Sequence, residues 1–200
     1  DYYLSEGEKK QIAEITKYNQ NIVLIINTGA QIDLTEMQQN EAVKGIVYLS
    51  QPGCEAGNVI ADIISGKVNP SGKLTSTWSV KYEDFPNAAT FSHCNGDTTN
   101  EKYEEGIYVG YRYFDSFGVK TLYPFGYGLS YTTFTTDHVQ VAAEGNTVTV
   151  TATVTNTGKA AGKQVVEVYA ACPQEARSRE LKKLVGFKKT GLLKPGESEN

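Results

Sequence analysis

The sequence predicts an α/β portion, with a mainly parallel sheet and helices, followed by an incomplete all-β sandwich. Three observations carry this prediction. Short apolar runs alternate with helical patterns over residues 1–79, residues 80–136 show no sustained period, and residues 137–200 carry apolar side chains at every second position. Alternating strands and helices favour a parallel sheet, whereas period-two strands separated by turn signals favour antiparallel pairing.

The first predicted helix begins at a capping box. Ser5 and Glu8 have the S-x-x-E spacing, in which the hydroxyl accepts from the backbone N–H of the glutamate and the carboxylate reaches back to the serine N–H. We expect the helix to continue to about Tyr18 and to bury Ile12 and Ile15.

Two short apolar runs, Ile22–Ile26 and Gly45–Leu49, are predicted to be strands. Wholly apolar, β-branched runs of this length are typical of strands that are buried on both faces of a parallel sheet. A short helix is expected between them, from Ile32 to about Asn40.

The segment SQPGCEAG leads from the second strand into another helix, which has one apolar face and a glycine, Gly66, where a left-handed C-terminal cap is expected. The apolar face consists of Val59, Ile60, Ile63 and Ile64. The loop Gln51–Gly57 lies at the carboxyl edge of the sheet, where α/β folds place their binding crevices. It is interpreted as a surface that faces another domain, with an ordinary exposed turn as the alternative.

The stretch EEGIYVGYRYFDSFG, residues 104–118, allows two interpretations: a sugar-binding platform or a strap that packs one domain onto another. Glu104 and Glu105 are the most obvious catalytic candidates. In an extended segment, however, neighbouring side chains point to opposite faces. A retaining glycosidase needs two carboxyl groups about 5 Å apart across the sugar. We therefore expect neither glutamate to be catalytic.

The strap interpretation is preferred, because tyrosine and phenylalanine bury large apolar faces. Tyr111 and Phe114 are expected to be buried, and Arg112 is spaced to pair with Asp115 or one of the two glutamates. Two glycines in the stretch permit close backbone approach: Gly106 and Gly110.

After residue 136, the valines alternate with polar residues in the manner of half-buried antiparallel strands. The pattern includes Val139, Val141, Val148, Val150, Ala152, Val154, Val166 and Val168. The turn signals EGN and NTGKAAG separate the runs. This pattern is typical of an immunoglobulin or fibronectin type sandwich, but only four or five of about seven strands fit before GLLKPGESEN. The chain is therefore expected to be a piece that is cut at both ends.

Composition excludes several function classes. The formal net charge of -4 argues against non-specific nucleic-acid binding, and no apolar run reaches the length of about 18 residues that suggests a membrane span. The glycine-rich fingerprints of nucleotide sites are missing. Ser50 and Ser92 lack a nucleophile elbow, and His93 beside Cys94 does not make a thiol protease.

The three cysteines, Cys54, Cys94 and Cys172, are widely spaced, without a CxxC pair. This spacing predicts three free thiols rather than a disulfide framework or a zinc site. His93 and His138 are the two histidines, so no metal cluster is expected. Unpaired cysteines slightly favour the cytoplasm as the compartment.

Four segments in order and spacing resemble glycoside hydrolase family 3: INTGAQIDL, QPGCEAGNVIADIISGKVNPSGKL, YEEGIYVGYRYFDSFGV and YPFGYGLSYTTF. The resemblance runs from Tyr2 to Asn200. It implies that residues 1–79 are the later part of an α/β sandwich domain, 80–136 a connector with the aromatic strap, and 137–200 an incomplete fibronectin type III-like domain. SQPG together with FSHCN favours the subgroup whose domain order is permuted.

The family's chemistry is retaining hydrolysis, with an aspartate nucleophile on a barrel domain and a glutamate acid in an SGEG-like motif. The matching region of this chain begins after that motif and contains no barrel. The resemblance therefore implies no catalytic residue here, and Glu6 and Glu8 at the first helix are not substitutes.

The resulting hypothesis is a portion of a β-glucosidase that cleaves terminal, non-reducing β-D-glucosyl residues and needs no cofactor or metal. Its substrate is expected to be a small β-glucoside or oligosaccharide, held through the missing barrel domain. No nucleic acid or membrane is expected as a partner, and a homo-oligomer is compatible with the hypothesis. The alternative is a non-catalytic carbohydrate-binding or protein-interaction module.

Overall fold

The computed structural model describes residues 2–171, 173 and 179–200. The chain forms two compact units. The first comprises Asp1–Gly57 and Ser76–Phe125, and the second comprises Asn58–Thr75 and Gly126–Asn200. In the described part of the chain, no helix has both the length and the apolar character to cross a membrane.

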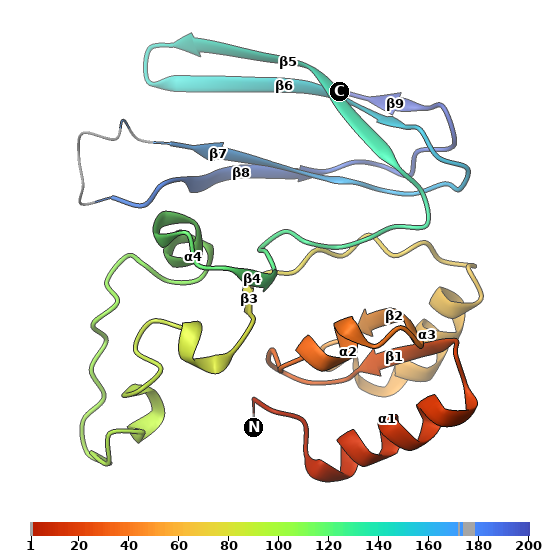
Figure 1. Cartoon of the computed structure of the whole chain (residues 1–200). Helices are drawn as coiled ribbons and strands as arrows, with labels where there is room; N and C mark the ends of the chain where they lie inside the picture. The colour runs from red at the N-terminus through yellow and green to blue at the C-terminus, as the bar shows by residue number, and fades with distance from the viewer. Residues whose placement is uncertain (1, 172, 174–178) are drawn as a thin grey trace. The chain divides into compact units, whose positions relative to one another are not determined.

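The first unit begins with an α/β arrangement of two helices and a parallel strand pair (Figure 1). Its elements are α1 (Glu6–Tyr18), β1 (Ile22–Ile26), α2 (Thr35–Gln39) and β2 (Val43–Tyr48). The predicted capping box is confirmed, because the Glu8 N–H donates to Ser5 Oγ at 3.3 Å and the Ser5 N–H donates to Glu8 Oε2 at 2.8 Å. The predicted parallel pairing is also confirmed.

The prediction that the first strand is buried on both faces is wrong. Val23 and Ile25 are 47% and 39% exposed, whereas Ile22, Leu24 and Ile26 on the other face are half-buried. In α1, Ile15 is exposed and Ile12 only half-buried, which corrects the expectation that both are buried. A sheet of two strands offers little surface for other elements to pack on, so these apolar side chains of the strand and the helix stay in contact with solvent.

The core of the first unit lies around a second, antiparallel strand pair, β3 (Trp78–Ser79) and β4 (Thr121–Tyr123). Trp78 is buried and meets the rings of Tyr48 and Tyr123 edge-on, at centroid distances of 5.2 and 6.1 Å. The Tyr2 hydroxyl lies 2.7 Å from Ser79 Oγ and ties the start of the chain to β3. Burial in this contact raises the pKa of Tyr2, although the Ser79 hydrogen bond opposes the shift.

Residues 80–136 contain more regular structure than the sequence predicts. Two short 3₁₀ turns, η2 (Tyr82–Asp84) and η3 (Phe91–His93), interrupt the predicted loop, and the aromatic stretch forms a helix, α4 (Tyr111–Phe117). Gly110 and Gly118, both with positive φ, bracket this helix. The aromatic stretch is therefore partly helical rather than extended, because packing of its rings outweighs their modest helix propensity.

The second unit contains most of α3 (Ala56–Ile64) and two antiparallel sheets. Gly66 follows α3 with φ +76°, as predicted for a left-handed cap. One sheet has the order β5-β6-β9 and the other pairs β7 with β8 (Figure 1). The bounds are β5 (Phe134–Glu144), β6 (Thr147–Asn156), β7 (Val165–Ala170), β8 (Lys183–Lys189) and β9 (Ser198–Glu199).

The predicted hairpin turn at EGN is confirmed, with Gly145 at positive φ between β5 and β6. Val139, Val141 and Val148 near this turn are exposed, which corrects their expected half-burial. The reason is partly local: His138 has φ +48° and the register shifts between Asp137 and Gln140, so a bulge redirects the strand before the hairpin tip.

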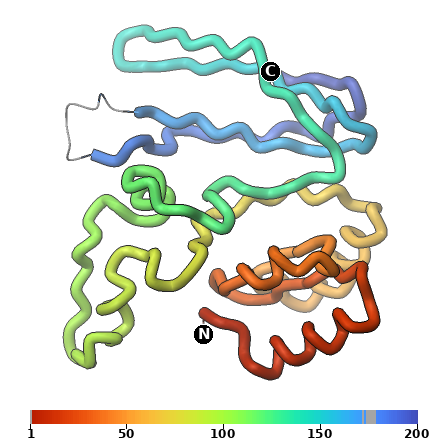
Figure 2. The backbone as a smooth tube through the Cα atoms, in the orientation of Figure 1, coloured from red at the N-terminus to blue at the C-terminus, as the bar shows by residue number. Residues whose placement is uncertain are grey.

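Inside the second unit, the segment after α3 runs beside the glycine-rich segment that precedes β5 (Figure 2). Asn69 joins them, because its Oδ1 accepts from the Tyr131 N–H at 2.8 Å. Its Nδ2 donates to the Ala161 carbonyl, between β6 and β7, at 2.9 Å. A Cβ on Gly128 would lie 2.4 Å from the Gly72 carbonyl oxygen. The alternation of glycine and aromatics in YPFGYGLSYTTF therefore reflects close backbone approach.

Candidate functional site

The carboxyl edge of the parallel strand pair carries an open hollow of about 390 Å³, lined by Asn27, Gln51, Pro52 and Gly53. Asn27 follows β1 directly, and the other three residues belong to the turn after β2. The loop Gln51–Gly57, which sequence patterning singles out, therefore contributes most of this hollow.

Backbone geometry shapes the turn after β2. Ser50 has φ +55°, a conformation that is uncommon for a residue with a side chain, and Gly53 has φ +72°. The missing side chain of Gly29 leaves room for the Gln51 amide, because a Cβ there would lie 3.2 Å from that amide. Strained backbone of this kind is often found at ligand-binding sites.

The hollow has amide chemistry and no acid–base chemistry of its own. Asn27 and Gln51 each offer a carbonyl oxygen as acceptor and an NH₂ group as donor, and no ionisable side chain is among the lining residues. Within the described part of the chain, no group of histidine, cysteine, aspartate or glutamate side chains could hold a metal ion. The arrangement can bind a neutral polar ligand but cannot by itself cleave a bond.

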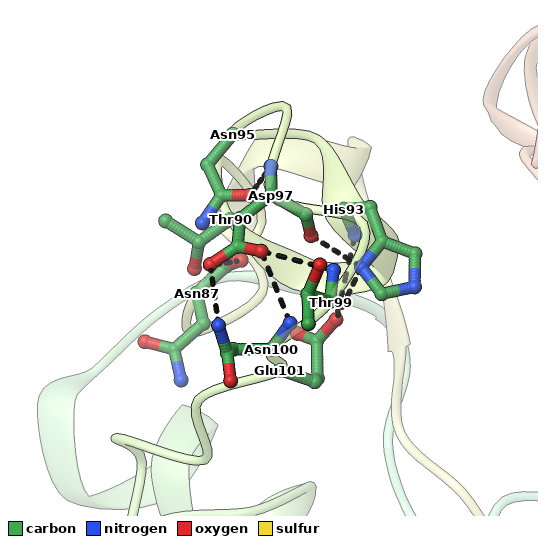
Figure 3. Close-up of polar contacts among 8 residues, drawn as sticks. All are labelled: Asn87, Thr90, His93, Asn95, Asp97, Thr99, Asn100 and Glu101. Carbon is green, nitrogen blue, oxygen red and sulfur yellow. Dashed lines mark hydrogen bonds and ion pairs between the residues drawn. The ribbon is translucent and has the colours of Figure 1, made fainter.

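A second polar cluster lies in the loop of residues 87–101 (Figure 3). Asp97 Oδ1 accepts from the backbone N–H groups of Thr99 and Asn100 at 2.9 and 3.0 Å, and Asp97 Oδ2 accepts from Asn100 Nδ2 at 3.2 Å. The Thr99 N–H, followed by the Asn100 contacts, lowers the pKa of this carboxyl. Because its hydrogen bonds are local, Asp97 holds the loop together rather than a ligand.

His93 belongs to the same polar cluster. Its Nδ1 lies 2.6 Å from the Asp97 carbonyl oxygen and 3.7 Å from Glu101 Oε2 (Figure 3). Asn87, Ser92 and His93 all have φ near +60°. Sequence reasoning treats this segment as a plain loop, although Asn95-Gly96-Asp97 is a turn signal that could have indicated a built structure.

Glu104 and Glu105 lie in different surroundings. Glu105 is half-buried and its Oε2 accepts from Asn87 Nδ2 at 2.7 Å, whereas Glu104 is exposed. The predicted pairing of Arg112 with Asp115 or one of the two glutamates stays a prediction.

The aromatic side chains of the stretch pack on one another. Phe114 is buried with its ring 5.6 Å from that of Phe85, as expected, whereas Tyr111 is only half-buried against Phe125 at 5.0 Å. Phe117 is exposed, yet its ring lies 5.1 Å from that of Tyr113. Rings that meet other rings in this way favour a packing role over a free sugar-stacking face.

Two of the cysteines, Cys54 in the turn after β2 and Cys94 in the loop of residues 87–101, are free and exposed. Cys172 lies outside the described residues. Neither described thiol lines the hollow.

Comparison with known proteins places these features in a family context. A model described as the glycosyl hydrolase family 3 C-terminal domain matches residues 1–111. Beta-glucosidase A of Butyrivibrio fibrisolvens is 38% identical, and the match covers 100% of this chain and 26% of that protein. Beta-glucosidase B of Emericella nidulans is 40% identical over 96% of this chain and 24% of that protein.

Solved structures agree with this match. Beta-glucosidase 3B from Thermotoga neapolitana, in complex with alpha-D-glucose, superposes with a TM-score of 0.93 at 39% identity, over 100% of this chain and 28% of that one. Beta-glucosidase from Kluyveromyces marxianus, in complex with glucose, gives a TM-score of 0.87 at 34% identity, over 100% and 23%. The chain thus spans about a quarter of the length of the relatives it matches.

Proposed function

Because this chain belongs to glycosyl hydrolase family 3, we propose that the whole protein is a retaining β-glucosidase that releases terminal, non-reducing β-D-glucosyl residues from small β-glucosides or oligosaccharides. One observation carries the proposal: the full length of this chain superposes on a β-glucosidase with a TM-score of 0.93 at 39% identity. Several relatives at 34–40% identity are also named β-glucosidases.

The proposal assigns catalysis to residues outside this chain. Retaining hydrolysis needs a nucleophilic carboxylate and an acid about 5 Å apart across the sugar. We place the nucleophile on a barrel domain and the acid in a glycine-rich loop that precedes Asp1. Two observations support the assignment of both catalytic carboxyl groups to residues outside this chain. The hollow has no ionisable side chain in its lining, and Glu105 is hydrogen-bonded to Asn87.

The domain assignment is part of the same proposal. Residues 1–79 are the later part of the α/β sandwich domain, residues 80–136 connect it, and residues 137–200 are an incomplete fibronectin type III-like domain. The antiparallel sheets of β5, β6 and β9 and of β7 and β8 support the last assignment. Asn58–Thr75 folds within the same unit as Gly126–Asn200, so that domain would also need the segment after α3.

Hydrolysis of an aryl β-glucoside by the intact polypeptide, followed by NMR of the first anomer formed, tests the proposal. β-Glucose as first product is expected, because double displacement retains configuration. The 200-residue chain, prepared free of host glycosidases, should show no turnover. An intact polypeptide that binds saccharides or another protein but never hydrolyses glucosides would instead be a non-catalytic module.

A further inference from the structure

We propose that the hollow lined by Asn27, Gln51, Pro52 and Gly53 is the binding subsite for the leaving-group sugar of a β-linked glucoside. This inference rests on the proposed β-glucosidase function and adds to it a ligand class and a place. The ligand is a neutral, hydroxyl-rich ring rather than an anion or an apolar aglycone.

The hollow lies at the carboxyl ends of β1 and β2, where parallel α/β sheets bind their ligands. α1 runs opposite to β1 (Figure 1), so its Ser5 end lies at the same edge. The Asp33 N–H, in the loop after β1, donates to the Tyr2 carbonyl at 2.7 Å. The segment that leads into α1 therefore reaches this edge, which is where the proposed acid must meet the leaving group.

Within the described residues, neither the Asn27 amide nor the Gln51 amide makes a side-chain hydrogen bond to the protein. Both amides can therefore donate to and accept from a ligand. Sugar hydroxyls also donate and accept, so two amides that line the same hollow can serve one ring without any charge. An anion would find no cationic side chain among the lining residues.

The positive φ of Ser50 turns the chain sharply after β2, and the Gln51 amide lies over the bare Gly29 backbone. A Cβ at position 29 would lie 3.2 Å from this amide, so the amide would have to shift by a few tenths of an ångström. Strain of this kind persists only where the surrounding structure holds it, which is common at ligand clamps.

The test compares two substrates in the intact enzyme: cellobiose, whose leaving group is a sugar, and an aryl β-glucoside, whose leaving group is not. The double variant Asn27→Ala, Gln51→Ala should lower the ratio of kcat/KM for cellobiose to that for the aryl glucoside about tenfold, since two hydrogen bonds to hydroxyls are removed. Gln39→Ala removes an exposed amide from α2 and serves as the matched control, with an unchanged ratio.

The outcomes separate the subsite from the enzyme. An unchanged ratio in the double variant, or an equal loss on both substrates, would overturn the subsite proposal and leave the β-glucosidase assignment intact. A parallel change in the Gln39→Ala control would overturn it as well. A wild-type enzyme that hydrolyses neither substrate would refute the proposed function itself, and the subsite with it.

Discussion

Replacing Phe114 by alanine should lower the free energy of unfolding of the chain by about 4 kcal/mol. The side chain is 1% exposed, and its ring meets those of Phe85 and Tyr113 edge-on. A buried aromatic ring removes about 150 Å² from water, which corresponds to about 4 kcal/mol at about 25 cal/mol per Å². The range of about 3–5 kcal/mol for Phe→Ala substitutions includes this value.

The matched control is Phe117→Ala in the same helix. Phe117 is 58% exposed, so its loss should cost about 1 kcal/mol, most of it from ring contacts with Tyr108 and Tyr113. Tyr111→Ala should fall between the two, because Tyr111 is half-buried. Urea unfolding measures all three, and the Phe114→Ala midpoint should fall by about 1–2 M.

The same variants decide between strap and sugar platform. If α4 is a packing element, Phe114→Ala should leave the glucose affinity of the intact, folded enzyme nearly unchanged. A Phe114→Ala variant that keeps its unfolding midpoint and loses glucose binding would show that α4 is a sugar-binding element and not a packing element. Equal destabilisation by Phe114→Ala and Phe117→Ala would also contradict it, because burial would then not determine the cost.

Three further predictions concern glycine packing, an acid-sensitive loop and the thiols. Gly128→Ala should lower the free energy of unfolding by about 2–4 kcal/mol, since a Cβ there would meet a backbone carbonyl at 2.4 Å. Gly57→Ala in α3, where a Cβ would have no atom within 4 Å, should leave the free energy of unfolding unchanged or raise it slightly. Urea unfolding measures both. N–H donors lower the pKa of Asp97 from 3.8, so the folded loop binds fewer protons than the unfolded loop. The stabilisation from Asp97 is therefore present above about pH 4 and is lost as the pH falls through the folded pKa. Protection of the loop from hydrogen exchange should drop in that pH window, and Asp97→Asn should remove the pH dependence. Cys54 and Cys94 should react rapidly with an alkylating reagent in the native chain, and three labels should be found after denaturation without reductant; a single label would indicate a disulfide.

Local signals explain the parts of the fold that the sequence predicts. The Ser5–Glu8 capping box depends on a spacing of three residues, and Gly66 at the end of α3 needs only its own positive φ. The turn at Gly145 likewise joins neighbouring strands. In each case the residues that specify the structure are adjacent in the sequence, so a pattern can reveal them.

Features that depend on distant residues escaped prediction. α4 has the sequence YRYFDSF, whose aromatic side chains recur at spacings of three and four, but seven residues are too few for that pattern to stand out. Phe114 is buried by Phe85, which comes from another segment. The exposure of Val23 depends on how many elements cover its sheet face, and that of Val139 depends also on the bulge after Asp137. Hydrophobicity alone specifies neither.

The candidate site was predictable only in its location. SQPGCEAG between a strand and a helix indicates the carboxyl edge of a sheet, and the hollow lies there. The positive φ of Ser50 and the approach of Gln51 to Gly29 come from the folded backbone and have no sequence signature. For the same reason, the polar cluster of Asp97 and His93 has only a short turn signal in the sequence.

Covalent trapping of the intact enzyme identifies the carboxylate that acts as nucleophile, which we place outside this chain. A 2-deoxy-2-fluoro glucoside with a good leaving group should accumulate the glucosyl-enzyme intermediate of a retaining glycosidase on its nucleophilic carboxylate. Peptide mapping by mass spectrometry should place the label outside these 200 residues, because we assign the nucleophile to a separate barrel domain. A label on Glu104, Glu105 or any other carboxylate of this chain would contradict the assignment of the nucleophile to another domain.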